Sequence, residues 1–187
     1  MKDFFILKKM FEQAKKKYKY FVFGKSSWGQ DLTCFEIGEG KECLLLQGGL
    51  HAREYVTSFL LLKMLDYLDS FFLPFRVLII PFMNPDGIEI CTKGVKYYKK
   101  PHFDNKKLNI NKFLINKISH FDIFKANGKG VDLNVNFDCD WGGGKNNFFA
   151  FPYYQNYVGP SPNSESETKA LIALTKKQKP ILIISYN

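Results

Sequence analysis

The sequence predicts a single α/β domain, and two observations support that prediction. Continuous apolar runs typical of buried strands alternate along the chain with segments whose apolar residues recur at helical spacing. The chain has 187 residues, of which 45% are hydrophobic, and this suits one sizeable core. We therefore expect one globular domain over residues 1–187.

The first half of the chain predicts two helices and two strands. Amphipathic periodicity over residues 3–17 predicts a short helix, and a longer helix is expected over residues 54–68. Between them lie DLTCFEIG (31–38) and ECLLLQG (42–48), which are separated by a glycine-containing turn. We expect these two strands to pair as a hairpin.

The next segments predict a central strand, a turn and a third helix. The run FRVLIIPF (75–82) is continuously apolar, as in strands that are covered on both faces. It is followed by NPDG (84–87), which has the residues of a tight turn. Helical spacing returns in NKKLNINKFLINKI (105–118).

The last part predicts long loops, a helix and a final strand. Residues 120–163 are rich in Gly, Asn, Pro and aromatic residues and predict long surface loops, which often carry function. Ser164 and Glu167 have the spacing of a capping box that starts a helix. PILIISY (180–186) is expected to be another buried strand.

The charge of the chain does not indicate nucleic-acid binding, although the net charge is +9. Of the 27 basic residues only Arg53 and Arg76 are arginines, the residue on which base-edge and bidentate phosphate recognition depends. Binding of nucleic acid through lysine is a third alternative, which a steep salt dependence would reveal. The scarcity of arginine makes Arg53 a stronger functional candidate.

Cysteine spacing and hydropathy predict a cytoplasmic protein with no membrane partner. Cys34, Cys43, Cys91 and Cys139 form no CxxC pair, so buried free thiols are expected rather than a disulfide framework or a zinc ribbon. The N-terminal apolar run, residues 4–7, is too short for a signal peptide. No apolar span reaches 18 residues.

One pair of residues has the chemistry of a metal site. His51 and Glu54 lie three apart where a strand turns into a helix, so an imidazole nitrogen and a carboxylate oxygen can point the same way. Alone this pattern is weak, and a capping or hydrated pair is the alternative. Further along, Asp132 and Asn134 would share one side of an extended chain.

Five blocks, in this order, resemble the zinc carboxypeptidase family typified by carboxypeptidase A, particularly bacterial members that trim cell-wall or other short peptides. The blocks are GGLHAREYVTS, NPDG, GVDLNVNF, GPSPNSESET and ILIISY. The resemblance runs from about residue 20 to the end. It implies a mixed, mostly parallel sheet flanked by helices in an α/β/α arrangement that is truncated at its C-terminal side, so that the domain over 1–187 is incomplete.

The resemblance also implies roles for individual residues. His51 and Glu54 correspond to the first two zinc ligands, and Arg53 to an arginine that helps to hold the substrate. Asp132 corresponds to the carboxylate that orients the ligating imidazole. Asn134 corresponds to the asparagine that binds a terminal carboxylate of the substrate.

Three positions depart from the family pattern. Val135 stands where a second carboxylate-binding arginine is expected. Lys125 or Lys129 would have to replace the arginine that polarises the scissile carbonyl. Asn187 occupies the place of the third zinc ligand, a histidine, and its amide oxygen is a weak ligand, so zinc binding is expected to be weak. The other histidines, His102 and His120, are not expected to substitute.

The resemblance implies hydrolysis of a peptide bond by zinc-activated water with a glutamate as proton shuttle. It places that glutamate after the last strand, so we expect no catalytic base in this chain, which would be inactive or severely impaired by itself. Whether the chain is an enzyme stays open at this point. The alternative is a non-catalytic peptide- or metal-binding protein that retains the cleft. The expected partner is a peptide, and a downstream fragment could complete the fold.

Overall fold

The computed structural model describes residues 2–93 and 123–187, which contain five strands and four α-helices. The strands are β1 (Lys19–Lys25), β2 (Asp31–Ile37), β3 (Cys43–Gln47), β4 (Arg76–Ile80) and β5 (Leu182–Ser185). The α-helices are α1 (Lys2–Lys17), α2 (Val56–Asp69), α3 (Pro85–Lys93) and α6 (Ser166–Gln178), and the short 3₁₀ helices are η1 (Ala52–Glu54) and η3 (Leu133–Val135).

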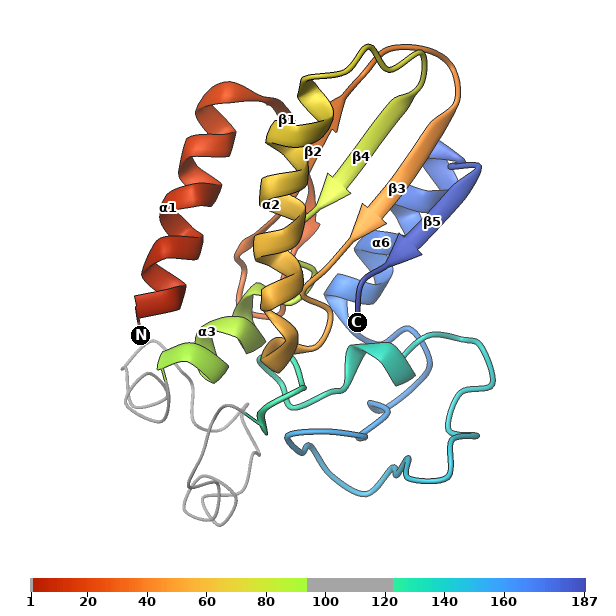
Figure 1. Ribbon diagram of the computed structural model, residues 1–187. Helices are drawn as coiled ribbons and strands as arrows, with labels where there is room; N and C mark the ends of the chain where they lie inside the picture. The colour runs from red at the N-terminus through yellow and green to blue at the C-terminus, as the bar shows by residue number, and fades with distance from the viewer. Residues whose placement is uncertain (1, 94–122) are drawn as a thin grey trace.

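These elements form three layers, as Figure 1 shows. The sheet has the strand order β1-β2-β4-β3-β5 and lies between α1 and α2 on one face and α6 on the other. Two pairings are antiparallel, β1 with β2 and β2 with β4, and two are parallel, β3 with β4 and β3 with β5. The predicted α/β fold with a mixed sheet flanked by helices is confirmed.

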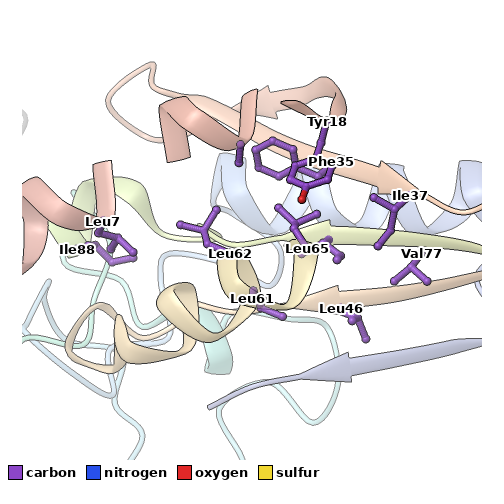
Figure 2. Packing of buried hydrophobic residues seen from close by; sticks show 12 residues of the cluster. Leu7, Tyr18, Phe35, Ile37, Leu46, Leu61, Leu62, Leu65, Val77 and Ile88 are labelled. Carbon is purple, nitrogen blue, oxygen red and sulfur yellow. The ribbon is translucent and has the colours of Figure 1, made fainter. Parts of the chain in front are cut away.

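Strand β4 is the centre of the sheet, as its continuous apolar sequence predicts. Val77 and Ile79 lie on the face covered by α1 and α2, in one cluster with Leu61 and Leu65. Figure 2 shows Val77 beside Leu61 and Leu65. Leu78 and Ile80 point to the opposite face and join a second cluster, to which α6 contributes Leu171 and Leu174. Because both faces are buried, a polar residue at any of these β4 positions would be left without water.

The predicted hairpin between β2 and β3 is wrong, because β4 lies between them. Ile37 of β2 is opposite Val77, and Leu45 of β3 is opposite Leu78. The connection between β2 and β3 crosses the start of β4, where Gly38 has a φ of +73° and an added Cβ would lie 2.3 Å from the Phe75 carbonyl oxygen. The strand with two apolar faces therefore takes the inner position.

The hairpin of this sheet is formed by β1 and β2, and β1 is not among the predicted strands. Lys25 pairs with Asp31, and residues 26–30 form the turn. Phe21 and Phe23 pack toward the α6 side, while Tyr20 and Val22 are exposed. The signal was present in the sequence, since KYFVFGK combines aromatic residues with a following Ser-Ser-Trp-Gly turn.

Two other local predictions are corrected by the structure. NPDG starts α3 instead of forming a tight turn: Pro85 is its first residue, and the Asn84 Oδ1 accepts a hydrogen bond from the Gly87 N–H at 2.9 Å, as an N-cap does. The predicted capping box is also absent. Glu165 is the N-cap residue of α6 and makes no side-chain cap bond, and Glu167 bonds to Ser27 instead.

The remaining predictions have mixed outcomes. The helices over 3–17 and 54–68 are confirmed as α1 and α2, and the helix over 105–118 lies outside the described residues. Residues 123–163 are irregular as expected, but they are not only surface loops, because many of their side chains are buried. Those that are less than 3% exposed include Phe124, Ala126, Asn127, Val131, Asp132, Leu133, Asn136 and Val158.

Strand β5 is not buried as predicted. It pairs with β3 on one side and has no partner strand on the other among the described residues, and Leu182, Ile183 and Ile184 are 50%, 43% and 37% exposed. The four cysteines are free, and all except Cys139 are buried. In the part of the chain that the structure describes, no helix is long and apolar enough to cross a bilayer.

The end of α6 yields a prediction about stability. Lys179 follows the helix in the left-handed region, with φ 48° and ψ 55°, and its N–H donates to the Thr175 carbonyl. A side chain is unfavourable there, so Lys179→Gly is expected to raise the free energy of unfolding by about 0.5–1 kcal/mol. Chemical denaturation measures the change. The control, Lys176→Gly inside the helix, is expected to lower it by about 1 kcal/mol, and equal effects of the two substitutions would contradict the assignment.

Candidate metal centre

His51 and Glu54 face each other at the carboxyl edge of the sheet. After β3 the chain turns through Gly49, with φ +63°, where an added Cβ would lie 2.7 Å from the Ser58 Oγ. His51 is the residue before η1 and is buried, and Glu54 ends that 3₁₀ turn. The His51 Nδ1 and the Glu54 Oε2 are 2.9 Å apart. The short helix thus brings the two candidate ligand atoms together, as the sequence spacing predicts.

The second ring nitrogen of His51 faces a buried carboxylate. The His51 Nε2 lies 3.4 Å from the Asp132 Oδ1, longer than a normal hydrogen bond, and has no closer polar partner. Asp132 has no solvent exposure, and its Oδ2 accepts from the Asn156 N–H at 3.0 Å and contacts the Lys125 Nζ at 3.1 Å. Burial would raise the pKa of Asp132, but the imidazole, the ammonium and the N–H hold it at about 2.

The pair fits two positions of a zinc site. Zinc binds imidazole nitrogen and carboxylate oxygen at about 2.0–2.2 Å, so two ligand atoms of a tetrahedral site are about 3.3 Å apart. The 2.9 Å separation of the His51 Nδ1 and the Glu54 Oε2 is close to that value. Asp132, on the other side of the ring, is placed to fix the ring orientation. Among residues 2–93 and 123–187, no three or more His, Cys, Asp or Glu side chains form a metal-binding group.

The candidate third position lies at the same edge. Because β5 runs parallel to β3, its C-terminal end lies beside the C-terminal end of β3, where the Tyr186 N–H donates to the Gln47 carbonyl at 2.9 Å. Asn187 follows directly, and His51 comes four residues after Gln47. Parallel pairing therefore directs Asn187 and the His51 loop to one edge of the sheet. His102 and His120 lie outside the described residues.

The two lysine candidates are separated by the structure. Lys125 is mostly buried, and its ammonium contacts Asp132 directly beside His51. Lys129 is exposed, and its Nζ lies 3.9 Å from the Glu165 Oε2. Of the two, only Lys125 is held in the His51–Asp132 group.

The candidate substrate-binding residues lie around this group. Arg53 is exposed next to the pair, with its Nε 3.7 Å from the Glu54 Oε1. Asp132 and Asn134 do not share one side of an extended chain as expected. Asp132 is the N-cap residue of the 3₁₀ helix η3 and is buried, whereas Asn134 lies within η3 and is exposed. Val135 is half-buried.

Asn84 is a residue of this centre whose role the sequence did not reveal. It is fully buried at the end of the β4 segment, and its Nδ2 donates to the Leu50 carbonyl at 3.2 Å and to the Ala126 carbonyl at 2.9 Å. It therefore ties the loop before His51 to the loop that carries Lys125. Only glycine fits at position 87 beside Asn84, because an added Cβ would lie 2.2 Å from the Ala126 carbonyl oxygen. The NPDG motif drew attention to Asn84, but the carbonyl groups that Asn84 binds belong to residues remote in sequence.

A second buried hydrogen-bond network connects the β1–β2 turn, α3 and the start of α6 to the loop that carries Lys125. Asp86 accepts hydrogen bonds from the Ser26 Oγ, the Trp28 N–H and the Gln30 Nε2 at 2.7–2.9 Å. Asn127 joins this turn to the start of α6, because its Nδ2 donates to the Ser27 Oγ and the Glu165 Oε2 at 2.8 Å. Burial raises the pKa of Glu167, which lies in the same network.

The fold and the pair together describe a three-layer α/β/α protein with a candidate zinc site at the carboxyl edge of its sheet. Residues 6–187 match the family described as zinc carboxypeptidase. The chain belongs to the zinc carboxypeptidase family.

Individual relatives agree with this assignment. Carboxypeptidase A2 of Mus musculus is 28% identical over 152 residues, covering 76% of this chain and 32% of the relative. Gamma-D-glutamyl-L-diamino acid endopeptidase 1 of Lysinibacillus sphaericus is 24% identical, covering 88% and 44%. The crystal structure of carboxypeptidase A from Helicoverpa armigera shares the fold, with a TM-score of 0.65 at 20% identity over 96% of this chain and 42% of that chain. The chain thus spans less than half the length of these relatives.

The Asp86 network yields a prediction about pH. Burial raises the pKa of Asp86 from 3.8 to about 7, against the hydrogen bonds donated to it. Between about pH 4 and 7 the folded state thus keeps a proton that the unfolded state releases, and stability falls as the pH rises through this window. Relative to Asp86→Asn, the wild type is expected to lose about 4 kcal/mol of unfolding free energy in total across it.

Denaturant titrations from pH 4 to 8 measure this difference. Asp138→Asn serves as the control because Asp138 is an exposed carboxylate. A wild type and an Asp86→Asn variant whose stabilities run parallel over the whole window would show that Asp86 is already ionised in the fold.

Proposed function

We propose that this chain carries the metal-binding half of a zinc metallocarboxypeptidase-like site that acts on short or cell-wall-type peptides. The observation that supports it most is the His51 ring, whose Nδ1 lies 2.9 Å from the Glu54 Oε2 while its Nε2 faces Asp132 at 3.4 Å. One nitrogen is thus oriented for a metal and the other for a supporting carboxylate. The relative named as an endopeptidase for gamma-D-glutamyl-L-diamino acid bonds agrees with the cell-wall-type substrate.

Separate residues of the chain would hold the metal, orient its ligand and bind the peptide. His51 and Glu54 would hold zinc, with Asn187 as a weak third ligand. When bound, zinc supplies Lewis-acid polarisation of a peptide carbonyl. Asp132 orients the imidazole, and Arg53 presents an exposed guanidinium beside the pair for the peptide's carbonyl or carboxylate oxygens.

Two further parts of the proposal concern recognition and charge. Asn134 is exposed next to buried Asp132, and its side-chain amide can bind a terminal carboxylate of the peptide. The next residue is Val135, so no arginine at that position contributes a second contact to the carboxylate. Lys125, and not exposed Lys129, supplies the positive charge beside the site, although its ammonium is already paired with Asp132.

We further propose that the 187-residue chain alone is inactive or severely impaired, because an amide at position 187 gives zinc a poor third ligand. The competing function is a peptide- or metal-binding protein without turnover, which exposed Arg53 and Asn134 also permit. A downstream segment that completes the fold and a cytoplasmic location remain predictions.

The proposal predicts weak zinc binding that one substitution strengthens. The wild type is expected to lose zinc to a chelator of moderate strength, because only two strong ligands are present. Asn187→His adds the missing imidazole and is expected to tighten zinc binding by at least about tenfold, without producing peptidase activity. A competition titration with a chromophoric chelator measures both affinities, and a C-terminal model peptide tests turnover.

The matched control is Asn146→His, which adds a histidine to an exposed loop. It should leave zinc affinity unchanged. The proposal is wrong if the wild-type complex survives a strong chelator, if both histidine variants bind alike, or if Asn187→His cleaves the peptide in a zinc-dependent way.

A further inference from the structure

A cavity separate from the candidate metal centre lies between α1, the start of β2 and α3, where α3 packs beside α1 (Figure 1). We call it the α1–α3 cavity. Its volume is about 250 Å³. A cavity of about 150 Å³ can hold benzene, so this one has room for an aromatic ring with a substituent. None of the residues that line it belongs to the metal centre.

The walls of the α1–α3 cavity are aromatic and are fixed by packing. Phe11 of α1 packs edge-on against Phe82, with ring centres 5.0 Å apart, and against Phe35 at 5.6 Å. Phe4 and Ile88 line the same cavity, and Ile88 has no solvent exposure. Because neighbouring side chains hold these rings, the cavity is formed without a ligand, and its walls favour a flat apolar molecule.

One buried hydroxyl in the cavity wall has no partner. Thr33 of β2 lines the cavity and is only 3% exposed, and its hydroxyl makes no hydrogen bond with any residue that the structure describes. Phe35 and Ile37, on the same face of β2, are buried in the apolar cluster. A buried hydroxyl without a hydrogen bond is unfavourable, so a ligand that bonds to Thr33 removes this cost.

The buried carboxylate of the cavity is already satisfied. Glu89 is 8% exposed, its Oε1 pairs with the Lys93 ammonium, and its Oε2 accepts from the Gln30 Nε2 at 3.3 Å. The other charged residues of the lining are two lysines and two carboxylates, Lys8, Lys15, Glu12 and Asp31. The lining therefore offers no excess charge of either sign, and a neutral ligand suits it better than an ion.

We propose that the α1–α3 cavity binds a small neutral aromatic molecule whose single hydroxyl or N–H group forms a hydrogen bond with the Thr33 Oγ1. The ring of the ligand packs against Phe4, Phe11 and Phe82, which adds aromatic contacts to the burial of its apolar surface. The inference goes beyond the proposed function, because it assigns a second site that needs neither zinc nor a peptide.

The test is an NMR titration of the full chain, without zinc, with 4-methylphenol and with 1,4-dimethylbenzene. The two probes have nearly the same shape, and only the first can form a hydrogen bond. The wild type is expected to bind both. Thr33→Val keeps the shape of the side chain and removes its hydroxyl, so it is expected to weaken binding of 4-methylphenol about fivefold relative to 1,4-dimethylbenzene, as for the loss of one neutral hydrogen bond.

A second variant shows whether the probes occupy this cavity. Lys8→Trp adds a large ring to the cavity lining and is expected to weaken binding of both probes at least about tenfold, because the indole takes the space that the probe needs. The matched control is Lys9→Trp, at the next position of α1, where the side chain is exposed and does not line the cavity. It should leave both affinities unchanged.

Three results would overturn the inference. They are the absence of binding of either probe to the wild type, equal effects of the two tryptophan variants, and an unchanged ratio of the two affinities in Thr33→Val. None of these results bears on the proposed function, which depends on zinc binding at His51 and Glu54.

Discussion

The carboxylate of Asp132 constrains the arrangement of the whole centre. It is fully buried, and an ionised carboxylate without partners in such a place would cost several kcal/mol. Its oxygens are met by the His51 ring, the Lys125 ammonium and the Asn156 N–H, which come from three different segments. The Asn134 N–H is a fourth neighbour, at 3.3 Å from the Oδ1. The chain satisfies this charge only when all of these segments assemble, so the geometry of the candidate ligand pair follows from it.

Asn84 and Asp86 extend the same logic to the scaffold. Asn84 caps α3 and donates to carbonyls on both loops of the centre, and Asp86 holds the turn of the β1–β2 hairpin. Both belong to NPDG, which directly follows the segment of the central strand β4. The central, most apolar strand β4 is therefore followed by the two polar residues that connect the sheet to the site. If β4 lay elsewhere in the sheet, Asn84 and Asp86 would lose these partners.

Local patterns predicted local structure well, and nonlocal pairing poorly. The period of apolar residues identified α1, α2 and β4, and the spacing of His51 and Glu54 predicted their contact. The wrong prediction of a β2–β3 hairpin shows why the strand order could not be predicted from local patterns. The strand order depends on which strand has two buried faces and on how the turn at Gly38 packs over Phe75. The capping box failed for a related reason, because Glu167 bonds to Ser27, 140 positions away.

Some residues of the candidate metal centre could be predicted from the sequence and others could not. The spacing of His51 and Glu54 predicted their contact. Asp132 was singled out by the family resemblance alone, because its expected placement beside Asn134 on an extended chain is wrong. Asn84 was not, because its partners are carbonyl groups, which no side-chain pattern encodes. The choice between Lys125 and Lys129 likewise required the fold, since both stand close to Asp132 in sequence and only one points at it.

The central claim is that the His51 Nδ1 binds the metal while Asp132 holds the opposite nitrogen. ¹⁵N NMR of the histidine rings during a zinc titration tests it directly, because the chain has three histidines and His51→Gln assigns the signal. The account predicts that zinc shifts the Nδ1 resonance of His51 and leaves its Nε2 protonated. A zinc-induced shift of the Nε2 resonance, or a response confined to His102 and His120, would contradict it.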